Sequence, residues 1–355
     1  MRRTTTTAAA LMLAGGLALA ACGGSDDAGP VTLTLVTYDS FPMKDTTLNA
    51  ALASFSDDTG IGVTIVQAGD AGTMVTKAAL TAGNPEGDVM WGVDNTLLSR
   101  AVEAQVFDPY ESTELSAIDP ALTALVPGNE VTPVDFGDVC INYDIAWFAS
   151  KGIEPPTTLE QLAEPAYRDL LVTQNPASSS TGLAFLLGTV AHFGTNGWQD
   201  YWTALRANGV KVVDSWDTAY YTDFSGSTGK GASPLVVSYA SSPPAEVIYA
   251  DPPRTDAPTA SVERSCFRQV EFAGVLRGTK HTEQARQLVD FLASKQVQQE
   301  VALALFVWPA RTDVTLPPEF TTYAAVVADP LTLAPSDIST NREAWVDQWT
   351  DIVLG

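Results

Sequence analysis

Hydrophobic and polar positions in the first third of the chain switch between the two-residue period of a strand and the longer period of a helix. Residues 31–38 alternate and are rich in β-branched side chains, which predicts a strand. Residues 47–59 place Leu48, Leu52 and Phe55 on one face of a predicted helix. The rhythm continues with strands expected at 62–66 and 88–93 and helices expected at 73–82 and 95–104. This repeated order of strand, helix and strand predicts a parallel sheet covered by helices.

The pattern changes after Pro127, and a second α/β unit follows. An alternating segment at 134–143 is expected to cross from the first unit to the second, and a segment at 267–275 is expected to return. The other expected elements are helices at 158–163, 182–193, 198–208, 282–294 and 337–354, and strands at 210–214 and 234–239.

The length of the chain indicates how these elements are divided. A single hydrophobic core stops growing at about 250 to 300 residues, so a chain of 355 residues predicts two α/β lobes. The expected boundaries are 31–138 with 268–318 for lobe 1, and 139–267 with 319–355 for lobe 2.

The N-terminal segment predicts export from the cytoplasm. Residues 1–21 join Arg2 and Arg3 to an apolar run and to small residues before Cys22, as in a secretory signal peptide. We expect Cys22 to carry a lipid and residues 22–30 to form a polar tether, which anchors the protein to the cell membrane at the surface or in the periplasm. An ordinary cleaved signal followed by a chance cysteine is the alternative.

Composition narrows the choice of partners. The formal net charge of −23 makes nucleic acid an unexpected partner. After the signal, the sequence has no apolar run near the roughly twenty residues that cross a bilayer, so lipid is the expected membrane attachment. We expect a monomer.

Two cysteines remain once Cys22 is assigned to the anchor. Cys140 and Cys266 form an even pair in an oxidising compartment, and both lie in strand-like runs. These observations favour a disulfide, and two separately buried thiols are the alternative.

The sequence gives little support for catalysis. Neither His192 nor His281 lies near a second metal ligand or in a nucleophile motif, so no catalytic residue, metal or cofactor is expected. Residues 227–230 have the spacing of a serine–lysine enzyme but lack its partner motif. An exported hydrolase and a structural lipoprotein stay as alternatives of other classes.

Polar and aromatic residues follow several predicted strands. Tyr38 and Asp39 follow the first strand, Asp94 the third, and residues 216–221 and 239–242 follow strands of the second unit. Open α/β sheets bind ligands at the carboxyl ends of their strands. Aromatic faces beside a carboxylate suit a flat organic cation, although ordinary core packing is the alternative for any single ring.

Six short motifs, taken in order, carry a resemblance to a known family. They are VTYDSF at 36–41, DVMWGVDNTLL at 88–98, PVDFG at 133–137, NYD at 142–144, SYASSP at 238–243 and VTLP at 314–317. With this set the chain resembles the thiamine-binding receptors of bacterial ABC importers over essentially its whole length after the signal.

The resemblance implies a type II periplasmic-binding-protein fold, in which two lobes joined by a crossing-strand hinge close over thiamine or its phosphates and dock on a permease. It implies that Tyr38 and Trp216 flank the ligand rings, with Tyr239 nearby, and that Asp70 and Ser179 are hydrogen-bonding partners. The full set of expected ligand-binding residues is Tyr38, Asp39, Asp70, Asp94, Ser179, Trp216, Tyr220, Tyr239, Ser242, Phe306 and Trp308.

The chain departs from the family pattern at two aromatic positions. Phe306 stands where members have a tryptophan, and Ala245 lies where a family tyrosine is expected, so we expect a rearranged aromatic site with Trp308 turned into the vacant place. The polar loop at 178–181 precedes a predicted helix, where it either accepts a phosphate tail or serves as an N-cap.

A ferric-ion receptor of the same fold is the alternative function. Tyr220 and Tyr221 are adjacent, as are the tyrosines that bind iron in related proteins. Their position after Trp216, away from the strand end at Tyr239, argues against this alternative.

Overall fold

The computed structural model describes residues 30–227 and 231–355. The export signal, Cys22 and nearly all of the tether therefore lie outside the described residues, as do three residues of the 227–230 motif.

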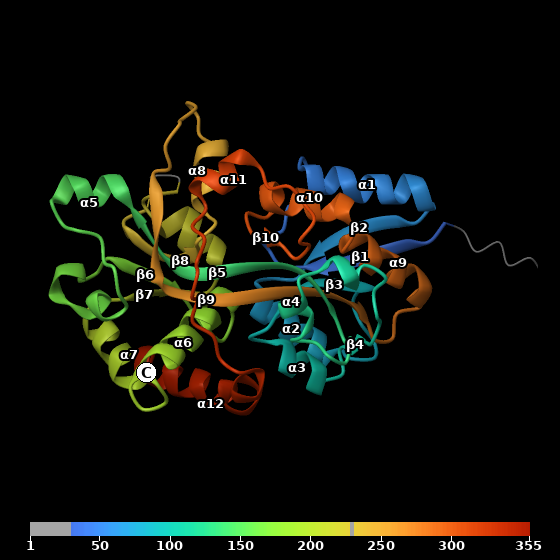
Figure 1. The fold of residues 1–355 in the computed structure, drawn as a ribbon. Helices are drawn as coiled ribbons and strands as arrows, with labels where there is room; N and C mark the ends of the chain where they lie inside the picture. Colours follow the sequence, from blue (N-terminus) through green and yellow to red (C-terminus); the bar gives the residue numbers. More distant parts are fainter. Residues whose placement is uncertain (1–29, 228–230) are drawn as a thin grey trace, which may run out of the picture.

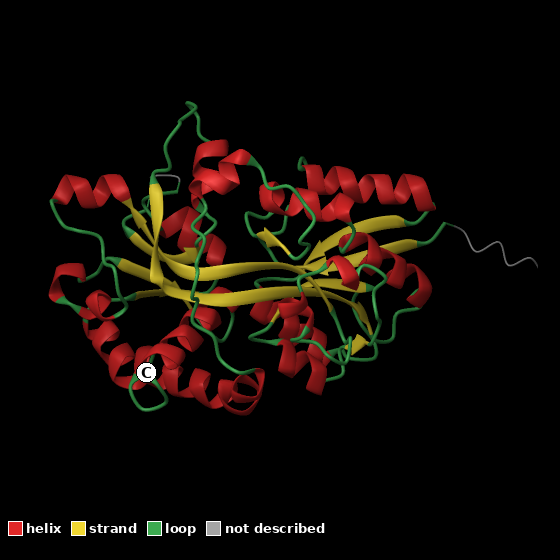
Figure 2. Ribbon diagram, in the orientation of Figure 1, coloured by secondary structure: helices red, strands yellow, loops and turns green. Residues whose placement is uncertain are grey.

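One sheet of ten strands runs through the molecule, and helices cover both of its faces (Figures 1 and 2). The main strand order is β2-β1-β3-β9-β5-β8-β6-β7, while β10 pairs with β5 and β4 with β9. The strands are β1 (Thr32–Thr37), β2 (Gly62–Gln67), β3 (Val89–Asp94), β4 (Phe107–Asp108), β5 (Thr132–Asp144), β6 (Leu171–Gln174), β7 (Lys211–Val213), β8 (Leu235–Tyr239), β9 (Thr259–Leu276) and β10 (Trp308–Pro309).

The helices follow the same chain order. They are α1 (Thr47–Thr59), α2 (Ala71–Leu80), α3 (Leu98–Glu103), α4 (Pro120–Thr123), α5 (Ile145–Lys151), α6 (Ser180–Phe193), α7 (Trp198–Ala207), α8 (Pro243–Ile248), α9 (Thr282–Leu292), α10 (Lys295–Ala304), α11 (Pro318–Tyr323) and α12 (Pro335–Val353). Short 3₁₀ turns lie at η1 (Leu115–Ala117), η2 (Glu160–Ala163) and η3 (Pro165–Tyr167), and η4 (Thr218–Asp223) is a π-helical turn. Among the described residues, no helix combines the length and the apolar character needed to cross a membrane.

The first third of the chain forms the predicted parallel unit. β1 lies between β2 and β3 and runs parallel to both. Thr46 begins α1 through a reciprocal capping box with Asn49, and the helix buries Leu48, Leu52 and Phe55 against the sheet. The periodicity therefore predicted this region well, because its contacts are local.

Two long antiparallel strands connect the ends of the sheet (Figure 1). β5 and β9 pair from Thr132 opposite Ala273 to Asp144 opposite Thr259. The expected returning strand began only at residue 267, but β9 begins earlier. The exposed Glu263 and Arg264 interrupt the apolar pattern there and hide the start of the strand.

The helices differ from the prediction in two ways. Residues 158–163 form only the 3₁₀ turn η2, and the helices α4, α5, α8, α10 and α11 were not expected. In α10 only Val297, Gln298, Val301 and Ala302 are buried, so a narrow and partly polar contact face carries little hydrophobic signal.

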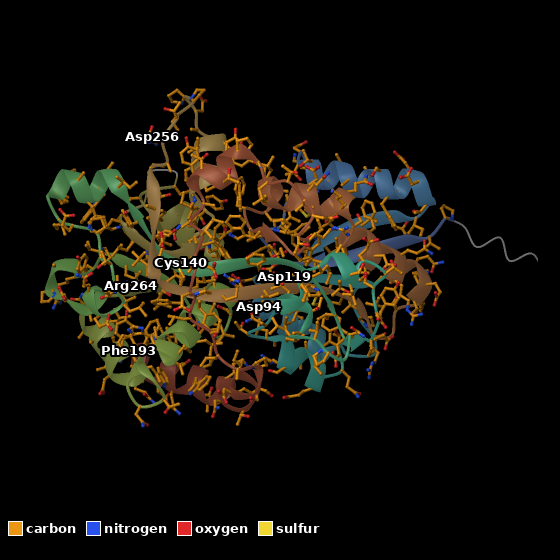
Figure 3. The ribbon with its side chains drawn as sticks, in the orientation of Figure 1. Asp94, Asp119, Cys140, Phe193, Asp256 and Arg264 are labelled. Carbon is orange, nitrogen blue, oxygen red and sulfur yellow. A yellow bond between two sulfur atoms is a disulfide. The ribbon has the colours of Figure 1, made fainter. Side chains whose placement is uncertain are left out.

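A disulfide joins the two crossing strands. Cys140 on β5 and Cys266 on β9 form this bond over a sequence separation of 126 residues (Figure 3). The pair packs with Ala240, which directly follows β8, and with Val327. The bond therefore links β5 to β9 next to Ala240, at the end of β8.

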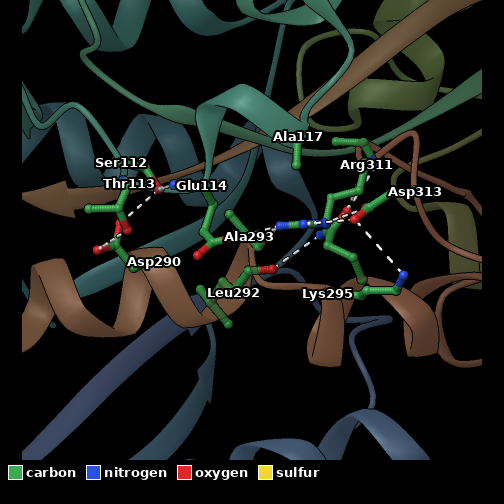
Figure 4. A network of polar contacts seen from close by, with 12 residues as sticks. Ser112, Thr113, Glu114, Ala117, Asp290, Leu292, Ala293, Lys295, Arg311 and Asp313 are labelled. Carbon is green, nitrogen blue, oxygen red and sulfur yellow. Dashed lines mark hydrogen bonds and ion pairs between the residues drawn. The ribbon is translucent and has the colours of Figure 1, made fainter.

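A buried arginine fixes the segment that follows α10 (Figure 4). The Arg311 guanidinium donates to Glu114 Oε2 at 2.5 Å, to Asp313 Oδ1 at 2.8 Å and to the Ala293 carbonyl at 3.1 Å. Its side chain is only 8% exposed, whereas those of its partners Glu114 and Asp313 are 33% and 46% exposed. The short strand β10, which ends two residues before Arg311, pairs with β5.

Candidate functional site

A cavity of about 230 Å³ lies where residues from both ends of the sheet meet. It is lined by Tyr38, Asp39, Ser40, Pro42, Thr46, Asp70, Ala71, Ser180, Thr181, Trp216, Tyr220, Tyr221, Tyr239, Ser242, Ala245, Tyr249, Glu271, Ala304, Leu305, Phe306 and Val307.

One side of the cavity, the carboxylate wall, consists of Tyr38, Asp39 and Asp70. Tyr38 and Asp39 directly follow β1, and Asp70 lies three residues after the end of β2. The Asp39 amide donates to the Gly69 carbonyl at 3.1 Å, which holds the two segments together. The Tyr38 ring lies directly over Gly92, where a Cβ atom would come within 2.4 Å of the ring. Gly92 therefore gives Tyr38 the room that it needs to face the cavity.

The opposite side, the aromatic wall, consists of Trp216, Tyr220, Tyr221 and Tyr239. Trp216 stacks on Tyr220 with ring centroids 4.8 Å apart and planes 13° apart, and the edge of Tyr221 meets it at 5.4 Å. The Trp216 indole N–H donates to Ser238 Oγ at 3.0 Å. The ring is thereby locked in place on the cavity surface.

Asp70 bridges the two walls. Its Oδ1 accepts from the Ser180 amide at 3.1 Å, and its Oδ2 accepts from the Trp216 amide at 3.2 Å. Burial, together with the nearby charge of Asp39, raises the pKa of Asp70 to about 6. The bridge places a carboxyl group at the N-terminus of α6, where the helix dipole favours negative charge.

Glu271 contributes to the cavity from the crossing strand β9 and was not among the expected residues. It is only 7% exposed. The one signal for it in the sequence is an acidic residue inside the apolar run Val270–Ala273 of β9, where burying a charge needs a reason. Nearby, the Tyr239 hydroxyl donates to Gln269 Oε1 at 2.6 Å.

The structure brings most of the expected ligand-binding residues to the cavity. Those that line it are Tyr38, Asp39, Asp70, Trp216, Tyr220, Tyr239, Ser242 and Phe306.

Three expected residues do not line the cavity. Asp94 is fully buried near the middle of the molecule (Figure 3), where its Oδ1 accepts from the amides of Thr96 and Leu97 at 3.0 and 3.1 Å. Ser179 pairs its hydroxyl with that of Thr181 at 3.0 Å. Both side chains are therefore already hydrogen-bonded within the protein, and Asp94 also accepts from Gln269 on β9.

The expectation that Trp308 turns into the site is also not met. Its ring stacks on Phe136 at 6.4 Å and meets the edge of Phe320 at 4.6 Å, outside the cavity lining. The unpredicted Tyr249 lies on the cavity instead, and its ring meets Phe306 at 5.7 Å. Tyr249 is four residues after Ala245, so helical spacing from the missing family tyrosine could have found it.

The polar loop before α6 supplies the residue at the N-cap position of that helix. Ser179 is the N-cap residue of α6, but its side chain makes no capping hydrogen bond. The Ser180 amide at the start of the helix already donates to Asp70.

The charges around the cavity have one sign. Within the described residues, the ionisable carboxyl groups that line it are Asp39, Asp70 and Glu271, and no lysine, arginine or histidine joins them. Such a lining favours a cationic ligand over an anionic one. Its aromatic wall favours a flat ligand.

The tyrosine pair is poorly suited to iron. The Tyr220 hydroxyl donates to Glu246 Oε1 at 2.7 Å, and burial raises the pKa of Tyr220 well above 10. Burial likewise raises the pKa of Tyr221 to about 12. Within the described part of the chain, no group of three or more histidine, cysteine or acidic residues is placed to hold a metal ion.

Comparison with known proteins agrees with this fold. A periplasmic thiamin-binding protein of known structure has a TM-score of 0.78 and 26% identity, covering 91% of this chain and 96% of that one. Iron-bound HitA from Pseudomonas aeruginosa, at a TM-score of 0.70 and 20% identity over 91% of this chain and 99% of that chain, shares the fold. The prediction of a type II periplasmic-binding-protein fold is confirmed.

Sequence comparison places the chain in a family. The thiamine-binding periplasmic protein of Salmonella typhimurium is 29% identical over 335 residues, which is 93% of this chain and 96% of that protein. The family model for bacterial extracellular solute-binding proteins matches residues 85–327, more than half of the chain. The chain therefore belongs to the bacterial extracellular solute-binding proteins, which are transport receptors that act outside the cytoplasm and not enzymes.

Proposed function

We propose that this protein is a thiamine receptor that binds its ligand between two lobes and delivers it to an ABC importer. The observation that carries the proposal is the cavity itself, which joins an aromatic wall to a lining whose ionisable side chains are carboxyl groups and tyrosines. Thiamine consists of two flat rings, and one of them, the thiazolium, carries a permanent positive charge. Each favourable contact between such a cation and an aromatic face contributes about 0.5 to 2 kcal/mol.

The cavity favours free thiamine over its phosphates. The Ser180 amide at the start of α6 is the natural donor for a phosphate, but it already donates to the carboxyl group of Asp70. A phosphate placed there would meet this acidic side chain without a nearby lysine or arginine in the described lining. The proposed ligand is therefore the unphosphorylated vitamin.

The proposed mechanism is a shift of population between open and closed forms. The proposed lobes are those expected from the sequence, 31–138 with 268–318 and 139–267 with 319–355, connected by β5 and β9. The Asp70 bridge supports this scheme, because it joins the end of β2 to Ser180 and Trp216 of the other unit. A ligand that touches both walls stabilises the closed form by its differential affinity, and the permease then recognises that form.

The proposed receptor is a monomer held at the membrane by a lipid on Cys22. A short tether confines the receptor near its permease and raises the effective concentration of the receptor without any new contact. The sequence supports this part of the proposal, since Cys22 follows an export signal and precedes a polar segment.

Isothermal titration calorimetry tests the function with five ligands: thiamine, its monophosphate, its pyrophosphate, ferric ion and spermidine. We expect saturable one-to-one binding of thiamine far below the millimolar range, weaker binding of both phosphates, and no saturable binding of spermidine, which has charge but no ring. Absence of thiamine binding below about 1 mM would reject the proposal. A visible tyrosinate-to-iron absorption band with ferric salt would favour the iron receptor.

A further inference from the structure

Three carboxyl groups lie side by side in the sheet beneath the cavity. Glu271 on β9 is the register partner of Asp94 on β3 and of Asp135 on β5. All three residues are at least nine-tenths buried. Because buried carboxyl groups without cationic partners are costly, such an arrangement calls for a reason.

Glu271 differs from its two neighbours in reaching the ligand cavity. Asp94 uses its carboxyl group to accept from Thr96 Oγ1, from two backbone amides and from Gln269, and Asp135 Oδ2 accepts from the Trp91 indole N–H at 3.0 Å. Neither Asp94 nor Asp135 lines the cavity, whereas Glu271 does. Glu271 Oε2 is buried and has no hydrogen-bond partner among the described residues.

We propose that Glu271 is the residue that selects for the positive charge of the ligand, because it lies in the middle of the carboxyl row and is the member of that row that lines the cavity. This inference rests on the proposed function, since it assigns a contact for the thiazolium cation. We call Glu271 and its register partners Asp94 and Asp135 the floor of the cavity. In this proposal the two walls supply the stacking surfaces, and Glu271 in the floor selects for charge.

The groups around Glu271 leave its carboxyl group without a positively charged partner. The groups that interact with it are Tyr38 after β1, Asp70 before α2, Asp94 on β3, Asp135 on β5 and Tyr239 on β8, and none of them supplies a positive charge. Burial first, and then the charges of Asp135 and Asp94, raise the pKa of Glu271 well above its usual range.

Ligand binding should therefore release a proton. In the empty cavity, burial and the neighbouring acids favour the protonated form of Glu271, and a bound cation supplies a counter-charge that favours the carboxylate. The O–H bond then breaks, its electron pair stays on the carboxylate, and the proton passes to the buffer. A neutral ligand of the same shape would leave the proton in place.

The test compares thiamine with an analogue whose thiazolium ring is replaced by an uncharged thiophene. Calorimetry in phosphate and in Tris buffer at about pH 7 gives both the affinity and the number of protons released, because these buffers differ in ionisation enthalpy. We expect the unaltered protein to prefer thiamine by roughly tenfold or more and to release protons when thiamine binds. The analogue should release none.

The variant Glu271→Gln should lose the preference for the cation to within about twofold and release no proton, while still binding the neutral analogue. Glu263→Gln is the matched control, because Glu263 is an exposed acid on the same strand β9 and lies outside the cavity lining. It should behave as the unaltered protein does.

Two results would overturn the inference. One is a Glu271→Gln variant that keeps its preference for thiamine over the neutral analogue. The other needs no variant and is thiamine binding to the unaltered protein without proton release. In both cases thiamine still binds and the proposed function survives, whereas an unaltered protein that does not bind thiamine rejects both.

Discussion

The carboxylate wall and the aromatic wall differ in chemistry, although both are built where parallel strands end. Tyr38 and Asp39 follow β1 directly, Asp70 lies shortly after β2, and together they bring two carboxyl groups to the cavity. The aromatic wall forms after β7 and at the end of β8, where the π-helical turn η4 stacks Tyr220 against Trp216. One unit of the fold thus supplies charge and the other supplies ring faces. A flat cation is the ligand class that satisfies both.

The largest expected effect comes from removing the disulfide behind β8, which should change the stability of the protein but not its ligand binding. Replacing both Cys140 and Cys266 by alanine should lower the free energy of unfolding by about 4 kcal/mol, because the bond closes a loop of more than a hundred residues. Urea-induced unfolding of the variant and of the unaltered protein measures this loss. Thiamine binding at 25 °C should persist, since neither cysteine lines the cavity. A loss below about 1 kcal/mol would show that the bond does not stabilise the crossing strands.

The next effect removes the central ring of the aromatic wall. Trp216→Ala should weaken thiamine binding by at least about tenfold, because stacking and cation–π contact are lost together. Trp308→Ala is the matched control, since that ring packs on Phe136 and Phe320 outside the cavity. Calorimetric titration of both variants decides the matter. Equal losses of affinity would mean that the two tryptophans had been assigned incorrectly.

A smaller effect tests the bridge between the walls. Asp70→Asn removes a charge from the cavity and from the N-terminus of α6, so thiamine affinity should fall by roughly fivefold. The relative affinity for thiamine monophosphate should rise, because the Ser180 amide is no longer held by a carboxylate. Competition between the two ligands measures this ratio. A ratio unchanged from that of the unaltered protein would exclude Asp70 as the reason for discrimination against phosphate.

The smallest effect concerns how the stability of the ligand-free protein depends on pH through its buried carboxyl groups. Burial raises the pKa of Asp70 and Asp94 to about 6 and that of Asp135 to about 7. The folded protein therefore binds more protons than the unfolded chain between about pH 4 and pH 7. In the ligand-free protein, these groups contribute most to the free energy of unfolding at the acid end of this window, and their contribution declines as pH rises. Thermal unfolding should show a midpoint a few degrees higher at pH 5.5 than at pH 7.5, and the opposite order would contradict these assignments.

The two walls also differ in how well the sequence predicted them. Tyr38 and Asp39 were found because a clear alternating strand ends beside them, and strand ends hold ligands in open sheets. Trp216 and Tyr239 were also singled out at predicted strand ends, and the family resemblance added their role beside the ligand rings. The π-helical turn η4 that packs Tyr220 against Trp216 gives no periodic signal. Tyr249 was missed because its place on the cavity depends on how α8 folds back toward Phe306.

The floor of the cavity was the least predictable part. Glu271 lies inside a buried crossing strand, and its register partners Asp94 and Asp135 are far away in the sequence. Such partners become visible only when the order of strands is known. Trp308 was misplaced for the same reason, because the pairing of β10 with β5 sets the direction of its ring.

A crystal structure of the complex with thiamine tests the central claim most directly. The account predicts thiamine in this cavity, with a ring between Tyr38 and Trp216 and the thiazolium facing the carboxyl groups of the floor. Thiamine bound outside the cavity, or bound within it with the thiazolium turned away from Glu271 and Asp70, would contradict the account.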